Sequence, residues 1–220
     1  MNTQLLLVIV VLVVIGWFAA GIILNLRKGD SLLKWMEGGL PLIGQRTSFR
    51  WLGSSVAELV ISKAKPPFRR CEILAVLEPR DVPWIWLLSR INGRRDTLII
   101  RAHLPSPPAL EFDLADPHSW TGRLAIKQDR QQGWENRLYR GKQLMAPNGN
   151  LDLSCEMLDR LSDPLTQISE PCWRFSLRHE PPHLELHLPL PNRHSIQSGD
   201  FFKALQDFGR LLAAREPKAP

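Results

Sequence analysis

The feature that most constrains this chain is an uncharged apolar run, LLLVIVVLVVIGWFAAGIIL, from Leu5 to Leu24. Twenty such residues form a helix long enough to cross the hydrocarbon core of a bilayer. A cleaved signal peptide is the alternative, but it has a basic segment before a shorter apolar core. Here only Asn2, Thr3 and Gln4 follow the first Met. We therefore predict a retained transmembrane anchor over residues 1–26.

Basic residues lie on only one side of this run. None precedes it, whereas Arg27, Lys28 and Lys34 follow it. Because positively charged flanks stay in the cytoplasm, we expect the rest of the chain to be cytoplasmic. The three cysteines have no paired or metal-type spacing, which suits a reducing compartment. The predicted location is therefore a single-pass membrane protein, in the plasma membrane of a prokaryote or the endoplasmic reticulum of a eukaryote.

Two groups of residues near the run are candidates for contacts in the membrane. Gly16 and Ala20 lie four residues apart with Gly21 beside them, and a face of small residues lets another helix approach closely. Glycine is also common in membrane helices for other reasons, so this pattern has an ordinary explanation. The residues expected at the membrane interface are Arg27, Lys28, Lys34 and Trp35.

The segment from residue 27 to 45 is expected to be a short helix at the membrane surface, followed by a linker. Asp30 or Ser31 would cap this helix, and Gly38 and Gly39 would end it. Residues 46–215 would then form the cytoplasmic domain, and residues 216–220 a tail.

The cytoplasmic domain contains the patterns of both strands and helices. The strand-like runs VAELVISKA and CEILAVL precede PWIWLLSRING, where Asn92-Gly93 marks either a hairpin turn or the end of a helix. The helix is favoured because apolar residues recur at positions 84, 87, 88 and 91. Asp81 would cap this helix, and Trp84 and Trp86 would lie in the core.

The rest of the domain completes an α+β pattern. A strand over TLIIRAHL is followed by short strands and proline-bearing loops, among them GRLAIKQD, and then by a helix over LDLSCEMLDRLSDPL. Asp200 would cap a final helix. The predicted fold is therefore α+β, with a single N-terminal transmembrane helix, a mostly antiparallel sheet and a C-terminal helix.

The string HEPPH, from His179 to His183, has the H-E-x-x-H form of zinc hydrolases. The two prolines forbid the helix that would place both histidines on one metal. Alternation of polar and apolar residues on both sides predicts a hairpin instead, with leucines inward and His183, Glu185 and His187 on the other face. These three residues are candidate metal ligands, although solvated polar residues on a strand are the ordinary case.

The net charge of +6 is distributed unevenly along the chain. The sector Arg46–Arg101 contains eleven basic and five acidic residues, whereas Glu111–Glu170 contains seven basic and ten acidic residues. A basic sector beside a membrane suits anionic lipid headgroups or RNA, and a plain solvated surface explains it equally well. No nucleic-acid-binding module is recognisable, so nucleic acid is not an expected partner.

The order of these elements resembles the calumin family, coiled-coil-domain proteins of the endoplasmic reticulum that partner Asterix in a chaperone complex for multipass membrane proteins. The stretch EPRDVPWIWLLSRINGRRDTLIIRAHLPS is similar to that family's short helix leading into a strand, and the final hairpin with GDFFKALQDFGRLLAA is similar to its closing elements. The likeness covers residues 32–214 as pattern and order. The family's acidic lumenal segment and charged C-terminal coil are absent, so calcium binding and ribosome contact do not carry over. The resemblance implies a membrane-anchored cytoplasmic domain that assists another membrane protein.

Two hypotheses for function follow. The sequence contains no G-x-S-x-G, phosphate-binding glycine loop or C-x-x-C motif. The first hypothesis is a non-enzymatic binding or scaffold protein without cofactor or metal, whose partners are the bilayer, anionic lipid and another integral membrane protein. The alternative is a membrane-tethered hydrolase or metal-dependent enzyme that uses the face of His183, Glu185 and His187.

Overall fold

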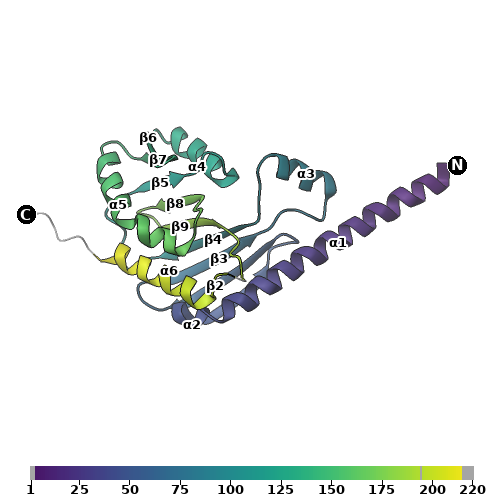
Figure 1. Cartoon of the computed structure of the whole chain (residues 1–220), viewed down its shortest axis with the longest axis horizontal. Coiled ribbons are helices and arrows are strands. Elements are labelled where there is room, and N and C mark those ends of the chain that lie inside the picture. The colour runs from purple at the N-terminus through teal and green to yellow at the C-terminus, as the bar shows by residue number, and fades with distance from the viewer. Residues whose placement is uncertain (1–2, 194, 215–220) are drawn as a thin grey trace, which may run out of the picture.

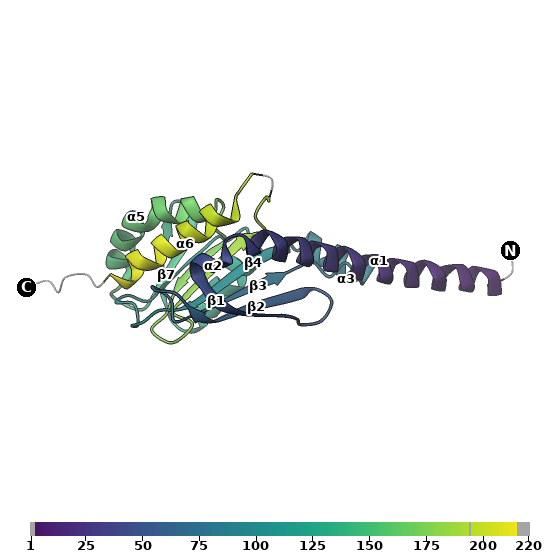
Figure 2. The same ribbon diagram turned by 90° about the horizontal axis from the view of Figure 1, so that it is seen from below.

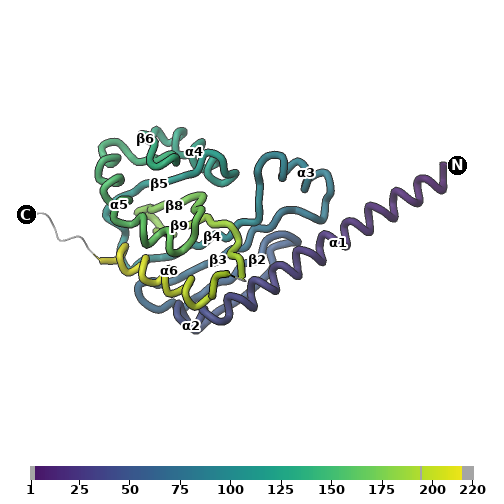
Figure 3. Tube along the Cα trace, in the orientation of Figure 1, coloured from purple at the N-terminus to yellow at the C-terminus, as the bar shows by residue number. Residues whose placement is uncertain are grey.

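The computed structural model describes residues 3–193 and 195–214. Within these residues, six helices and a nine-stranded antiparallel sheet form an α+β fold, as predicted. One long helix projects from the domain, and the chain path can be followed from purple to yellow (Figures 1 and 3). The predicted tail, residues 216–220, and the last residue of the predicted domain, 215, lie outside the described residues.

The strands lie in the order β1-β2-β3-β4-β9-β8-β5-β7-β6 across the sheet. Their bounds are β1 Gly44–Trp51, β2 Val56–Ala64, β3 Arg70–Val76, β4 Thr97–His103, β5 Phe112–Ala115, β6 Glu135–Tyr139, β7 Lys142–Ala146, β8 Arg174–Leu177 and β9 Leu184–Pro189. The predicted hairpin is β8 and β9, which pair with each other and lie between β4 and β5. Residues near the end of the chain therefore join the two halves of the sheet.

The helices are distributed over both faces of this sheet. They are α1 Thr3–Glu37, α2 Leu40–Ile43, α3 Pro83–Ile91, α4 Trp120–Gln131, α5 Leu151–Ile168 and α6 Ser198–Ala213. Figure 2 shows α2, α5 and α6 on one face. Helix α4 covers part of the other face, where Ala125 and Ile126 pack on Ala115 of β5.

The main core lies between the sheet and α6. Phe175 of β8 is fully buried and meets Phe112 and Phe208 edge to face, with ring centroids 5.2 and 5.4 Å apart. Leu184, Leu186 and Leu188 are also fully buried. The alternation that predicted the hairpin therefore places its apolar residues in the core, because successive side chains of a strand point to opposite faces.

The predicted separate helix at the membrane surface is wrong. Helix α1 runs without a break from Thr3 to Glu37, and Asp30 and Ser31 lie inside it. The predicted anchor and juxtamembrane segment are thus parts of one helix, which ends before Gly38 and Gly39 as expected. The helix continues because Gly29, Leu32 and Met36 still pack on the domain.

The segment GRLAIKQD is a second correction, since it belongs to helix α4 rather than to a short strand. The side chain of Ser119 caps this helix by accepting a hydrogen bond from the amide of Gly122, at 3.0 Å. Its buried positions include Ala125, Ile126 and Asp129 at helical spacing, so a charged residue occupies one position of the buried face. The buried carboxylate obscured the pattern in the sequence.

Two expected caps also differ from the structure. Helix α3 is confirmed as a helix with Pro83 in its first turn, but Val82 is its N-cap. The carboxylate of Asp81 accepts a hydrogen bond from the hydroxyl of Ser54 instead, at 2.7 Å. Helix α6 begins at Ser198, so Asp200 lies within its first turn.

We expect Phe175→Ala to lower the free energy of unfolding by about 3–5 kcal/mol, because it leaves a cavity between the rings of Phe112 and Phe208. Leu138→Ala is the matched control, since Leu138 is 68% exposed and should change this free energy by less than about 0.5 kcal/mol. Urea unfolding of the full chain in detergent micelles measures both. Equal losses in the two variants would contradict the assigned core.

Candidate functional site

Helix α1 has an exposed half and a half that belongs to the domain. It is long and apolar enough to cross a membrane, by length and composition, and only 6% of its most apolar 18-residue window is buried. The core helix of a soluble protein would be mostly buried. From Gly21 onward, one face packs on the domain through Gly21, Asn25, Gly29, Leu32 and Met36, which follow one another at steps of three or four residues.

Asn25 is the polar centre of this contact and is fully buried. Its amide nitrogen donates to the carbonyl oxygens of Ser54 and Glu78, both at 3.1 Å. Its amide oxygen accepts from the guanidinium of Arg80 at 3.0 Å. A buried amide costs little only when its hydrogen bonds are made, so Asn25 fixes the position of the Glu78–Arg80 loop on α1.

An ion-pair cluster continues from Asn25. Arg80 binds both oxygens of Asp96 at 2.9 Å, and Lys28 of α1 donates to the same carboxylate at 2.6 Å. The amide of Glu78 also donates to Asp96, at 2.8 Å. Burial by itself raises the pKa of Asp96, but these hydrogen bonds outweigh it and hold the pKa below its ordinary value.

The backbone before α3 lies directly against α1. A Cβ atom added to Gly21 would lie 2.3 Å from the carbonyl oxygen of Arg80, so only glycine permits this approach. The indole of Trp17 donates to the same carbonyl at 3.0 Å, and its ring lies 6.1 Å from that of Trp86. Helix α3 therefore lies beside the middle of α1, within the predicted span (Figure 1).

The apolar face of α3 points away from the domain, contrary to the prediction that Trp84 lies in the core. No residue of α3 is buried, and five large apolar side chains are exposed by 45% or more. They are Trp84, Ile85, Leu87, Leu88 and Ile91. Trp86 is only half-buried, and its indole donates to Glu78 at 2.7 Å. Periodicity identified the apolar face of α3, but the domain does not cover it.

We call these five side chains, with the exposed apolar side chains of α1 from Leu5 to Phe18, the α1–α3 surface. An apolar cavity of about 200 Å³ lies where the two helices meet, lined by residues that include Val14, Phe18 and Trp84. Contiguous exposed apolar surface of this kind marks a membrane or protein contact. The α1–α3 surface is the principal candidate site.

The three predicted packing residues of the span fall in different places. Gly16 has open space around it, and Ala20 is exposed. Gly21 instead packs against the chain's own Arg80 backbone. Gly16 and Ala20 are therefore open to contact, whereas Gly21 is already covered.

The four residues predicted at the membrane interface also lie in different surroundings. Arg27 and Lys34 are exposed, and Lys28 pairs with Asp96. Trp35 belongs to the domain, since its indole donates to the carbonyl of Ile196 at 2.8 Å and its ring packs on α6. Asn25 was not predicted as a contact residue, although it is a polar residue directly after the apolar run.

The second predicted site is the polar face of β9. Nδ1 of His183 accepts from the amide of Leu104 at 3.0 Å, and burial, with the nearby His103, lowers the pKa of His183. His183 and His187 are buried, not solvated as expected for this face. Among residues 3–193 and 195–214, no group of three His, Cys, Asp or Glu side chains is placed to hold a metal.

Glu185 is engaged by its neighbours on this face. It accepts hydrogen bonds from Arg101 at 2.7 Å and Arg174 at 2.9 Å, and Nε2 of His187 lies 2.7 Å away. Burial alone would raise the pKa of Glu185, but His187, Arg174 and Arg101 lower it to about 2. This carboxylate is therefore part of a structural ion-pair network.

The network continues to two fully buried carboxylates, Asp113 of β5 and Asp129 of α4. Arg174 binds both oxygens of Asp113, and Arg178 bridges Asp113 and Asp129 at 3.2 and 2.7 Å. The Arg178 guanidinium also lies 4.1 Å from the centre of the Trp134 ring. These bonds attach α4 to the sheet. Burial first, and the charge of Asp113 second, raise the pKa of Asp129 to about 6.

Gly21→Leu should displace the Glu78–Asp96 segment from α1, because the added side chain would overlap the backbone of Arg80 and Asp81. Gly16→Leu is the matched control, since a Cβ there has no atom within 4 Å. Hydrogen–deuterium exchange of the full chain in micelles should rise in residues 78–96 for Gly21→Leu only. The same rise in both variants would contradict the contact.

The raised pKa of Asp129 predicts a specific pH dependence. The folded protein retains a proton on Asp129 up to about pH 6, whereas the unfolded chain loses it near the ordinary aspartate pKa of about 4. The stability of the wild type relative to Asp129→Asn should therefore fall as the pH rises from 4 to 6, and level off above 7. Chemical unfolding of both proteins across this range tests it. A difference that grows with pH would show that the pKa is lowered instead.

No protein-family model matches the sequence, and no curated protein matches it significantly.

Proposed function

We propose that this chain is a single-pass membrane protein whose cytoplasmic domain binds another integral membrane protein and acts as a scaffold rather than an enzyme. The observation that carries this proposal is the α1–α3 surface, in which α3 presents five exposed apolar side chains beside the apolar helix α1. A soluble domain has no use for such a surface in water, and exposing it costs free energy.

The architecture of α1 supports a retained anchor. Its C-terminal half contributes Asn25, Gly29, Leu32 and Met36 to the buried interior of the domain. Removal of the apolar run as a signal peptide would cut the helix beside these residues and expose the Asn25 contacts. The exposed Arg27 and Lys34 support a cytoplasmic domain by the positive-inside rule.

The position of α3 supports a partner within the membrane. The start of α3 lies beside α1 at Val14–Phe18. A bilayer that contains α1 therefore also contains the exposed face of α3, in its cytoplasmic leaflet. The cavity between Phe18 and Trp84 accommodates an apolar side chain of a neighbouring helix, and Gly16 and Ala20 permit close backbone approach. Contacts from two elements held in one membrane raise the effective concentration of each.

The resemblance to the calumin family supports the same direction. In that family, a membrane-anchored cytoplasmic domain assists the biogenesis of other membrane proteins. The stretch that carries the resemblance includes α3, whose exposed apolar face requires a partner. Assistance to the biogenesis or assembly of a membrane protein complex is therefore the form of scaffolding that we propose.

The test is co-purification of the partner in mild detergent from native membranes. Carbonate extraction first tests the anchor, and protease added to the outside of intact cells tests the orientation. All variants should remain in the membrane pellet, with the domain protected from the protease. Leu87→Gln with Leu88→Gln should reduce recovery of the partner at least tenfold, because each leucine loses about 1.5–3 kcal/mol of burial. Gly16→Leu with Ala20→Leu should also reduce it.

Leu138→Gln with Leu153→Gln is the matched control, because these leucines are 68% and 50% exposed on elements remote in sequence from α3. This control should retain the partner. Full recovery of every partner by both test variants would refute the proposed binding surface. Release of the wild type by carbonate would refute the anchor itself.

A further inference from the structure

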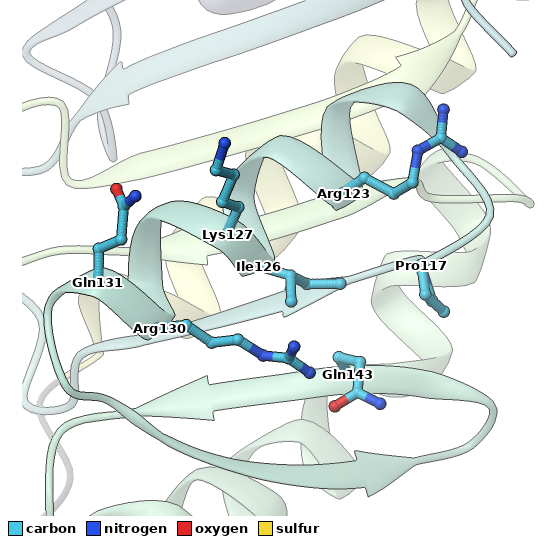
Figure 4. A pocket seen from close by; sticks show the side chains of 7 residues that line it. All are labelled: Pro117, Arg123, Ile126, Lys127, Arg130, Gln131 and Gln143. Carbon is cyan, nitrogen blue, oxygen red and sulfur yellow. The ribbon is translucent and has the colours of Figure 1, made fainter. Parts of the chain in front are cut away.

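A basic groove on α4 lies next to the α1–α3 surface and is separate from it. Arg123, Lys127 and Arg130 recur at steps of four and three residues on one side of α4 (Figure 4). They line a groove of about 560 Å³ with Pro117, Ile126, Gln131 and Gln143. No acidic side chain of the described residues lines it, so the groove is electropositive.

Direct contacts join this helix to the end of α3. The guanidinium of Arg123 donates to the carbonyl oxygens of His118 and Asn92, and Asn92 is the C-cap of α3. The guanidinium of Arg94 lies 5.0 Å from the centre of the Trp120 ring at the start of α4. The basic groove is therefore held at a fixed position beside the end of α3.

Positive charge is concentrated along this junction. Residues 83–95 contain three arginines, at positions 90, 94 and 95, and no acidic residue. The only acidic residue of α4, Asp129, is fully buried and bound to Arg178. Together with the three cations of the groove, this gives six basic side chains, of which Arg90 pairs with Glu78 at 3.4 Å.

We propose that the α4 groove binds the phosphate headgroups of anionic phospholipids in the leaflet that contains α3. This inference rests on the proposed membrane anchoring. An apolar helix face flanked by cations is the arrangement by which interfacial helices select anionic bilayers. Cations near such a surface are attracted to anionic headgroups, and guanidinium groups bind phosphate oxygens in a bidentate manner.

The lining of the groove favours a lipid over RNA. Ile126 and Pro117 line it together with the cations, and Leu124 of the same helix is 51% exposed. No aromatic side chain of the described residues lines the groove, and sequence-tolerant RNA binding depends on aromatic stacking. Acyl chains beside a headgroup, in contrast, suit apolar side chains next to cations.

The test is native mass spectrometry of the full chain in detergent micelles, titrated with phosphatidylglycerol and with phosphatidylcholine. The wild type should bind phosphatidylglycerol at least tenfold more tightly than phosphatidylcholine. Arg123→Gln, Lys127→Gln and Arg130→Gln together should abolish this preference. Arg123 also donates to the carbonyl oxygens of two loops, so its substitution affects the fold as well as the charge. The double variant Lys127→Gln with Arg130→Gln is therefore the second test, and its preference for phosphatidylglycerol should fall at least fivefold.

Arg46→Gln, Lys63→Gln and Lys203→Gln together form the matched control, which removes the same charge from exposed positions outside the groove and should keep the preference. Equal binding of the two lipids by the wild type, or equal losses in control and groove variants, would overturn the inference. Wild-type binding of inorganic phosphate or a short RNA at the same strength, lost in the groove variants, would overturn the assignment to lipid. Carbonate extraction of the same proteins tests the anchor separately, because α1 should retain every variant in the membrane.

Discussion

The buried amide of Asn25 determines how the apolar helix and the domain are joined. Two of its three hydrogen bonds reach the segment that leads into α3, and the third reaches the carbonyl of Ser54 between β1 and β2. Arg80 and Asp96 extend this set of contacts to Lys28 on the same helix. Loss of any partner would leave a buried polar group unpaired, at a cost of about 1–3 kcal/mol. The junction therefore permits one arrangement of α1 and α3, and the position of the α1–α3 surface depends on it.

A second polar network positions α4 on the other side of the sheet. The arginines at 174 and 178 connect Glu185, Asp113 and Asp129, so that strands from both halves of the sheet and the helix share one set of charges. Buried ion pairs add little net stability over apolar packing, but they tolerate few alternative geometries. The network fixes α4 with its basic residues outward and its single carboxylate inward. Two buried polar clusters thus place an apolar surface and a basic surface next to each other.

The strength of the sequence signals varied with how local they are. The hairpin of β8 and β9 was predictable because prolines break the chain and side chains alternate on both sides. Helix α3 was predictable from the spacing of Trp84, Leu87, Leu88 and Ile91, and Pro83 indicated its start. Helix α4 was not predicted, since Asp129 occupies one of its buried positions and its pattern is only intelligible with Arg178 present. For the same reason, the spacing of Arg123, Lys127 and Arg130 could not be recognised as one side of a helix.

The sequence by itself determined the apolar helix, the α+β class and the faces of individual elements, because these depend on residues within one or two turns or strands of each other. Only the tertiary structure decided what each face meets. The apolar side of α3 has the spacing of a core helix, yet it remains exposed because the loop before it is held on α1 by Gly21 and Asn25. Trp35, which composition assigns to the membrane interface, packs on α6 instead. Periodicity shows which side of an element is apolar, whereas contacts between residues more than fifty positions apart decide whether the domain covers that side.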